Sequence, residues 1–368
     1  MKFASLEFFQ FQIPLVKPLK LAGKVHSSRE GLVVRLNDER GHFGVSEIAP
    51  LPGWHQENLQ EALHQLSEET PPFLIELNES FSRRENFDSG IKNKWDNFFP
   101  SVRWGLEIAL LQLRANQNGC CLFHFSNKSY QNVIHVNALL TGGDHKILQE
   151  ARDRMAEGYR TLKVKVGRSS MEEEIKLVKD LRDNVGPEIN IRLDANQSWN
   201  ISQAIHFAKS VKDLGIEYIE EPVEQIQDLS KLQQETNIKV ALDESLYGQS
   251  PEKIQFPSNA KYLILKPTRL GGVKKLFKWI DLARTKKLGI VISSTFESGI
   301  TISVLSQLSG MLRPDNLAMG LDTLRWLKKD LLEEDIKIQQ GQIDIQKVAA
   351  VGQKINWDML QFIKKIQL

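Results

Sequence analysis

Cysteine is nearly absent from this chain of 368 residues, which has only Cys120 and Cys121. These two are adjacent and poorly placed to bridge each other, so the sequence offers no disulfide framework. Neither has the neighbours of a thiolate zinc site. Such scarcity is typical of a protein that folds in a reducing compartment, and we therefore expect a cytoplasmic location.

Long apolar runs and a charge excess are also missing. No segment approaches the roughly 20 apolar residues that span a bilayer, and the start, Met1-Lys2-Phe3, is not followed by the apolar stretch of a secretory signal. The formal net charge is +2, and no basic block with interleaved aromatic residues is present. We expect neither a membrane span nor a nucleic-acid partner.

The first 120 residues predict an α+β unit, because strands precede helices without alternation. Hydrophobic alternation and turn residues predict strands over 6–13, 31–36 and 42–47, and helical spacing predicts helices over 59–66 and 100–118. Residues 19–29 are polar and are expected to form a loop, whereas residues 78–98 are too mixed to assign. The tail, 325–368, is expected to pack back on this unit.

From residue 133 the pattern changes to alternating strands and helices. The predicted strands are 133–138, 161–166, 189–194, 216–220, 239–243, 261–265, 289–293 and 317–321, with amphipathic helical stretches between them. Eight such units predict a modified (β/α)8 TIM-type barrel over residues 130–324.

Charged residues end five consecutive predicted strands, at Lys165, Asp194, Glu220, Asp243 and Lys266. Their separations of 29, 26, 23 and 23 residues match the length of a strand, a returning helix and two loops. The carboxyl ends of parallel strands form the mouth of a barrel, where catalytic groups lie. Isolated charged strand ends are usually solvated, but five successive units make that explanation a poor one.

Three of these charges are carboxylates, Asp194, Glu220 and Asp243, which we expect to converge. Unpaired carboxylates in one mouth repel each other unless a cation lies among them. Oxygen ligands without His or Cys favour Mg²⁺, with Mn²⁺ as a substitute. The alternative is that Arg192, Lys163 and Lys266 pair with the carboxylates and no metal binds.

Lys165 and Lys266 come from strands on opposite sides of the predicted ring. A lysine in water has a pKa of about 10.4, too high for a base at neutral pH. Enclosure beside a divalent cation and a second ammonium would lower that value. Such a base is suited to removing the proton α to a carboxylate, while the metal and the other lysine hold the enediolate.

These motifs resemble the enolase superfamily, and within it the muconate-lactonizing-enzyme subgroup. The resemblance rests on the order and spacing of five short motifs: Lys163-x-Lys165, Asp194-Ala-Asn196, Glu220-Glu221-Pro222, Asp243-Glu244-Ser245 and Lys266-Pro267. It implies an N-terminal α+β capping domain over 1–120, completed by 325–368, together with a barrel catalytic domain. It also implies that Asp194, Glu220 and Asp243 hold Mg²⁺.

Further stretches resemble the o-succinylbenzoate synthases of menaquinone biosynthesis, a family in this subgroup. They are 28–31 and 46–53 in the capping unit, 293–298 at the seventh strand, and 320–323 at the eighth. The resemblance implies a small-molecule carboxylate substrate and a syn dehydration, in which Lys165 is base and then acid and Lys266 stabilises the enolate. It further implies substrate contacts from the following residues: Lys163, Arg192, Asn196, Ser293, Ser294, Gly320 and Asp322. Arg29 is either a support of the cap loop or a solvated side chain.

Two other functions stay open on the sequence. Dipeptide epimerases and N-acylamino acid racemases of the same superfamily share both lysines, although Gly320-Leu321-Asp322-Thr323 lacks the Asp-x-Asp pair expected of the epimerases. A barrel that binds a ligand without turnover belongs to a different class. Such a protein has no evident reason to keep all five charges.

Overall fold

The computed structural model describes residues 2–21, 24–82, 94–120, 122, 131–142, 144–312 and 317–368. Cys120 is a free thiol, and Cys121 lies outside the described residues. No helix in the described ranges has the length and apolar character needed to cross a membrane.

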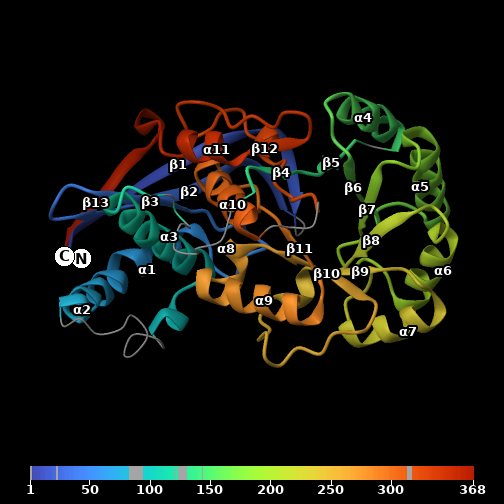
Figure 1. Ribbon diagram of the computed structural model, residues 1–368, viewed down its shortest axis with the longest axis horizontal. Helices are drawn as coiled ribbons and strands as arrows, with labels where there is room; N and C mark the ends of the chain where they lie inside the picture. Colours follow the sequence, from blue (N-terminus) through green and yellow to red (C-terminus); the bar gives the residue numbers. More distant parts are fainter. Residues whose placement is uncertain are drawn as a thin grey trace.

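The first layer is an antiparallel sheet with the strand order β13-β1-β2-β3, covered by helices (Figure 1). Its elements are β1 (Phe3–Leu21), β2 (Lys24–Asp38), β3 (Phe43–Ile48), α1 (Leu59–Glu68), α2 (Thr70–Ser82), a 3₁₀ turn η1 (Lys94–Asn97), α3 (Pro100–Gln117) and β13 (Gln361–Gln367). We call this unit the cap. Gly44 on β3 allows α3 to pack closely, since a Cβ there would lie 2.0 Å from the carbonyl oxygen of Ala109.

The tail joins the cap through β13, which pairs with β1. The expected loop over 19–29 is wrong, because β1 and β2 continue as a long hairpin with Leu19 opposite His26 and Leu21 opposite Lys24. Main-chain pairing joins the two strands here, and Leu19 packs against the apolar cluster that includes Phe11 and Ile13. The alternation Leu19-Lys20-Leu21 is too short to predict a strand.

The second layer is a curled parallel sheet with the order β11-β10-β9-β8-β7-β6-β5 among the described residues. Its strands are β5 (Ala138–Leu140), β6 (Thr161–Lys165), β7 (Asn190–Asp194), β8 (Ile216–Glu220), β9 (Val240–Leu242), β10 (Ala260–Leu265) and β11 (Gly289–Ile292). The intervening helices are α4 (Asp144–Ala156), α5 (Met171–Val185), α6 (Ile201–Val211), α7 (Leu229–Glu235), α8 (Pro267–Leu270), α9 (Val273–Lys286) and α10 (Gly299–Leu312). Helices α4 to α7 follow its outer edge (Figure 1).

Local sequence explains why these units alternate. The strands are buried on both faces, as expected for parallel sheets covered by helices. Helix α5 begins at a capping box formed by Ser170 and Glu173, and it turns Val178 and Leu181 into the core. The sequence therefore specifies both the helix start and the face that packs on the sheet.

Two of the eight predicted strands differ from the structure. Only Ala138–Leu140 joins the parallel sheet from the first, since β4 (Val133–His135) pairs antiparallel with β12 (Gln342–Asp344). The eighth reduces to isolated bridges: Met319 bonds to residues 135 and 137, and Gly320 bonds to residues 292 and 294. This short segment links both edges of the curled sheet. The remaining short elements are η2 (Ile226–Asp228), η3 (Glu244–Leu246), η4 (Leu324–Trp326), α11 (Ile345–Val351) and η5 (Trp357–Met359).

A buried polar cluster joins the cap to the barrel. Arg29 of β2 is buried and donates to the carbonyl oxygens of Phe296, Pro50 and Ala49, at 3.0, 3.3 and 2.5 Å. Glu47 of β3 accepts hydrogen bonds from Ser298 N and Oγ, the latter at 2.7 Å. Arg29 is thus a support of the cap loop, not a solvated side chain.

This cluster makes stability depend on pH. Burial, together with the nearby Glu297 carboxylate, raises the pKa of Glu47 to about 7. A carboxyl whose pKa is raised by folding stabilises the protein fully below its unfolded pKa of about 4.5, and that contribution is lost as the pH rises through about 7. We expect Glu47→Gln to reduce the loss of unfolding free energy between pH 5 and pH 8 by on the order of 3 kcal/mol.

Urea unfolding at the two pH values measures this difference. Glu68→Gln, at an exposed position of α1, is the matched control and should leave the pH dependence unchanged. Equal pH dependence in wild type and Glu47→Gln would contradict the expectation.

Candidate active site

The ends of five neighbouring strands place the predicted charges together. Strand register sets Lys165 of β6 opposite Asp194 of β7, and Asp194 opposite Glu220 of β8. Asp243 and Lys266 follow β9 and β10, the next strands in the sheet. Side chains that follow adjacent parallel strands meet at one edge, so sheet order alone brings these residues together.

The Lys163 ammonium lies between two carboxylates of this mouth. Its Nζ is 2.8 and 2.7 Å from the Oε atoms of Glu220 and 2.9 Å from Oδ2 of Asp194. Burial disfavours the charged form, but Asp194 and Glu220 outweigh it and raise the pKa of Lys163 well above its ordinary value. Lys163 is therefore a fixed cation and not a base.

Asp194 and Glu220 both contact the Lys163 ammonium, but their pKa values shift in opposite directions. Burial opposes the ionised form of both, but Asp194 also has Lys165 Nζ at 3.5 Å, and the two lysines lower the pKa of Asp194. Burial and the Asp194 charge raise the pKa of Glu220 to about 8. A further cation beside Glu220 would therefore favour the ionised form of this carboxylate.

Lys165 is the lysine of the mouth whose pKa is lowered. Burial lowers the pKa of Lys165, and the ammonium groups of Lys163 and Lys266 lower it further, against the opposing effect of Asp194. Its ammonium donates to Oδ1 of Asn196, whose Nδ2 in turn donates to Glu244 at 3.0 Å. Asn196 thus orients Lys165.

Asp243 and Lys266 form a buried ion pair on the other side of the mouth. Burial opposes ionisation of Asp243, but Lys266 and Arg269 lower its pKa. The Tyr247 hydroxyl also donates to Asp243. The Lys266 Nζ lies 4.5 Å from the centre of the Trp54 ring, so a cap residue covers this lysine.

The donor set of the mouth fits Mg²⁺. Asp194, Glu220 and Asp243 supply carboxylate oxygens, which hard divalent cations prefer. As the side chains stand, no group of three His, Cys, Asp or Glu residues in the described part of the chain is arranged to hold a metal ion. Lys163 and Lys266 pair with these carboxylates instead. Metal binding would therefore require the two ammonium groups to withdraw.

A small pocket of about 60 Å³ opens beside the lysines. Its lining includes Lys163, Lys165, Lys266, Ser293, Ser294, Gly320 and Asp322, as predicted, together with apolar walls from Trp54, Tyr218, Ile264, Val291 and Phe296. Ser294 Oγ lies 2.8 Å from Thr323 Oγ1 and 3.2 Å from the Gly320 carbonyl oxygen. Both serines of the predicted pair face the pocket.

The predicted contact Asn196 does not line this pocket and instead accepts a hydrogen bond from Lys165. Arg192 does not line the pocket either, contrary to the prediction. It is fully buried beneath it, with Nε 2.6 Å from Glu217 and Nη1 2.6 Å from the carbonyl oxygen of Ala318. Arg192 lies two residues before Asp194 on the same strand, and therefore one layer deeper in the barrel. Arg192 therefore contacts buried groups of the protein itself, which hold the barrel together.

Sequence patterns missed several residues that shape the site. Trp54 and Tyr247 come from loops far apart in the sequence, so only the folded chain brings them to Lys266 and Asp243. Glu221 accepts from the backbone N–H of Asp243 and of Ser245, at 2.7 and 2.8 Å, and so holds the loop after β9. The φ angles of Asn196, Gln197, Glu221 and Phe296 are positive, at 43°, 61°, 41° and 63°. Backbone strain of this kind is typical of functional sites.

Two family models match the chain. Residues 146–359 match the model described as "Enolase C-terminal domain-like", and residues 3–113 match "MenC, N-terminal domain".

Individual relatives agree with these models. The chain is 31% identical to an o-succinylbenzoate synthase of Pasteurella multocida, over 87% of this chain and 89% of that protein. It is 30% identical to the chloroplastic protein PHYLLO of Arabidopsis thaliana over 91% of its own length, but it spans only 22% of that longer protein. A solved dipeptide epimerase of Enterococcus faecalis, complexed with Mg and the dipeptide L-Leu-L-Tyr, superposes with a TM-score of 0.80 at 23% identity. That match covers 94% of this chain and 97% of the epimerase, and it shows a shared fold.

The position of Arg192 gives a test that separates a structural residue from a substrate contact. We expect Arg192→Met to lower the free energy of unfolding by about 3–5 kcal/mol, because it leaves the Glu217 carboxylate without its partner. KM should change little in the fraction that folds. Urea unfolding measures the stability, with Arg160→Met at an exposed position as control. Unchanged stability together with a raised KM would instead indicate that Arg192 contacts the substrate.

Proposed function

We propose that this chain, which belongs to the enolase superfamily, is a lyase that dehydrates 2-succinyl-6-hydroxy-2,4-cyclohexadiene-1-carboxylate to 2-succinylbenzoate in menaquinone biosynthesis. The observation that carries the proposal is the mouth itself, where a buried lysine of lowered pKa and a second buried lysine flank three carboxylates. The relatives described as o-succinylbenzoate synthases, at about 30% identity over most of both chains, support this choice of substrate.

Asp194, Glu220 and Asp243 are the residues that would hold Mg²⁺. When bound there, Mg²⁺ would balance the negative charge that develops on the substrate carboxylate as the α-proton leaves. Lys163, which now neutralises Asp194 and Glu220, would turn toward the substrate as a second positive charge.

Lys165 carries both proton transfers in this proposal. Its neutral amine takes the proton α to the ring carboxylate, and the resulting ammonium gives that proton to the departing hydroxyl group, which leaves as water. A syn elimination needs the base and the acid on one face, so one residue serves for both. The ring becomes aromatic, and no electron acceptor is required.

Lys266 has a different task. Trp54 covers its ammonium, which would leave Asp243 when Mg²⁺ binds there. A fixed ammonium opposite Lys165 stabilises the enediolate without exchanging a proton. The apolar walls formed by Trp54, Phe296 and Ile264 suit the flat ring of the product and exclude water from the reacting carbon.

The main alternative is an epimerase of the same superfamily, in which both lysines act as bases. Asp322 is the residue at the eighth strand that would bind the substrate ammonium. It is already engaged, by the Tyr159 hydroxyl at 3.0 Å and by Arg325 Nε at 3.0 Å. These contacts disfavour a role for Asp322 in holding a dipeptide.

We expect the purified chain with Mg²⁺ to convert the cyclohexadiene carboxylate into 2-succinylbenzoate, followed by the ultraviolet change of aromatisation. Exhaustive chelation should abolish turnover, and so should Asp243→Asn, which should also lose Mg²⁺ binding measured by calorimetry. Efficient epimerisation of dipeptides without aromatisation would move the assignment to the alternative. Full activity without metal would remove the role of the three carboxylates.

The division of labour between the lysines is tested by isotope exchange. We expect Lys165→Ala to lose dehydration by about 10³-fold or more and also to stop exchange of the substrate α-proton with deuterium oxide, followed by NMR. Lys266→Arg keeps the cation but changes its shape, so turnover should fall without a new base appearing. If Lys165→Ala exchanges at the wild-type rate while Lys266→Ala does not, the roles are reversed.

A further inference from the structure

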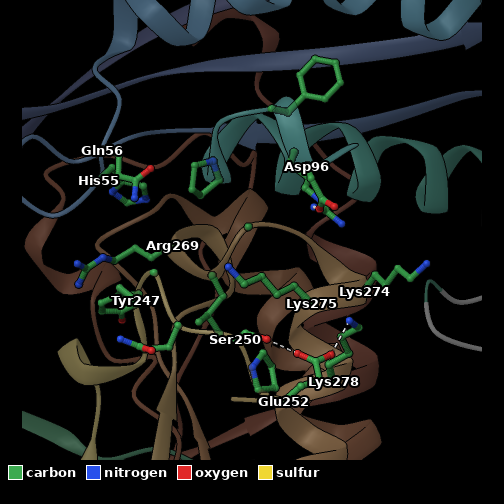
Figure 2. Close-up of a pocket in the computed structure, with 18 of the residues that line it drawn as sticks. His55, Gln56, Asp96, Tyr247, Ser250, Glu252, Arg269, Lys274, Lys275 and Lys278 are labelled. Atoms are coloured by element: carbon green, nitrogen blue, oxygen red, sulfur yellow. Dashed lines mark hydrogen bonds and ion pairs between the residues drawn. The ribbon is translucent and has the colours of Figure 1, made fainter. Parts of the chain in front are cut away.

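A second, larger cavity of about 820 Å³ is lined by residues of both the cap and the barrel. Trp54 lines both cavities. Its ring faces Lys266 Nζ at 4.5 Å and the Arg269 guanidinium carbon at 5.6 Å, both measured to the ring centre. We call this cavity the basic cleft. Its walls come from residues 54–56, the start of α3, the loop 247–252, and the start of α9 (Figure 2).

Positive charge predominates in the basic cleft. Five cationic side chains line it, against two carboxylates: Arg103, Arg269, Lys274, Lys275 and Lys278, with Asp96 and Glu252. Burial and the nearby cations lower the pKa of His55 to about 3, so this imidazole adds no charge at neutral pH. Both carboxylates are already taken, since Glu252 pairs with Lys278 at 2.7 Å and Asp96 pairs with Arg103.

Lys275 is a cation without an ion pair among the described residues. Its side chain extends toward the side of Arg269 and Tyr247, whereas Lys274 points the other way (Figure 2). Burial and Arg103 lower the pKa of Lys275, against the opposing effects of Asp96 and Glu252. Lys275 also lies in the first turn of α9, where the helix dipole favours negative charge. An anion in the basic cleft would relieve both unfavourable interactions.

Arg269 adds a second unsatisfied group and connects the basic cleft to the reaction pocket. Its guanidinium carbon lies 3.5 Å from the centre of the Tyr247 ring, and its buried Nη1 makes no hydrogen bond in the described part of the chain. The Tyr247 hydroxyl donates to Asp243. A residue that lines the basic cleft is therefore hydrogen-bonded to one of the charges of the mouth.

The two cavities differ greatly in volume. About 60 Å³ admits only one or two water molecules, whereas ligand sites are typically 300–1,000 Å³. The reaction pocket must therefore open before a substrate enters, and the basic cleft is already large enough to hold one. Separate cations at Lys275 and Arg269 match a ligand with two separated negative groups.

We propose that the basic cleft captures organic dicarboxylate dianions and delivers them past Trp54 to the reaction pocket. The proposal rests on the proposed function, because both the cyclohexadiene substrate and 2-succinylbenzoate carry two carboxylates. Lys275 supplies the charge that binds the dianion first. Neither Lys275 nor its contacts belong to the catalytic set.

The kinetic test compares Lys275→Gln with Lys286→Gln, which removes the same charge from an exposed position at the other end of α9. We expect Lys275→Gln to lower kcat/KM roughly fivefold at low salt with kcat unchanged, and the difference to shrink at 0.5 M NaCl. Lys275→Arg should restore the wild-type value, and Lys286→Gln should leave kcat/KM unaltered. Equal kcat/KM in all four proteins at low salt would overturn the proposal.

A binding test stands apart from turnover. Calorimetric titration with 2-succinylbenzoate, in the presence of a chelator, should show binding to wild type and Lys286→Gln that is weakened in Lys275→Gln. If wild type binds 2-succinylbenzoate as expected but does not dehydrate the cyclohexadiene carboxylate, the proposed function is wrong and the proposal for the basic cleft is supported. If dehydration is normal but wild type binds no 2-succinylbenzoate, or Lys275→Gln binds it equally well, the basic cleft fails and the proposed function stands.

Discussion

The site depends on one requirement, which is that buried charges in the barrel mouth must be balanced. Parallel strands bring Asp194 and Glu220 to the same edge, and the Lys163 ammonium between them keeps that arrangement stable. Burial and the ammonium groups of Lys163 and Lys266 then lower the pKa of the neighbouring Lys165. The same sharing of charge therefore gives the buried carboxylates a partner and lowers the pKa of one neighbouring lysine.

The cap takes part in this balance and does not merely cover it. Arg29 and Glu47 fix the cap loop against residues 296–298, and that loop carries Trp54 to Lys266. Apolar walls from both layers then surround the lysines. The strand-end charges of the barrel and the cap loop are thus joined through a few buried contacts between distant parts of the sequence.

Sequence patterns predicted the barrel class and the convergence of five charges, because strand order and side-chain alternation are local rules. The resemblance to known families placed Arg192 in the pocket, whereas the folded chain buries it beneath the pocket against Glu217 and the Ala318 carbonyl oxygen. The extension of β1 and β2 over 19–21 and 24–29 was not predicted because its alternation of apolar and polar residues is too short. Trp54 and Tyr247 reach the site only through tertiary packing, which no local pattern reports. The boundaries at 1–120 and 130–324, and the roles of the site residues, stay predictions.

Strand β13 has a consequence for how the molecule is assembled. It completes the cap sheet by pairing with β1, with Ser5 opposite Gln367, so the whole barrel lies between the two partners in the sequence. During synthesis, β1 and β2 emerge long before β13, and the β1 edge stays unpaired while the barrel is made. An open edge of this kind is a template for intermolecular pairing, and contacts so distant in sequence form slowly. Aggregation during synthesis would therefore begin at the cap, although the five strand-end charges lie in the barrel.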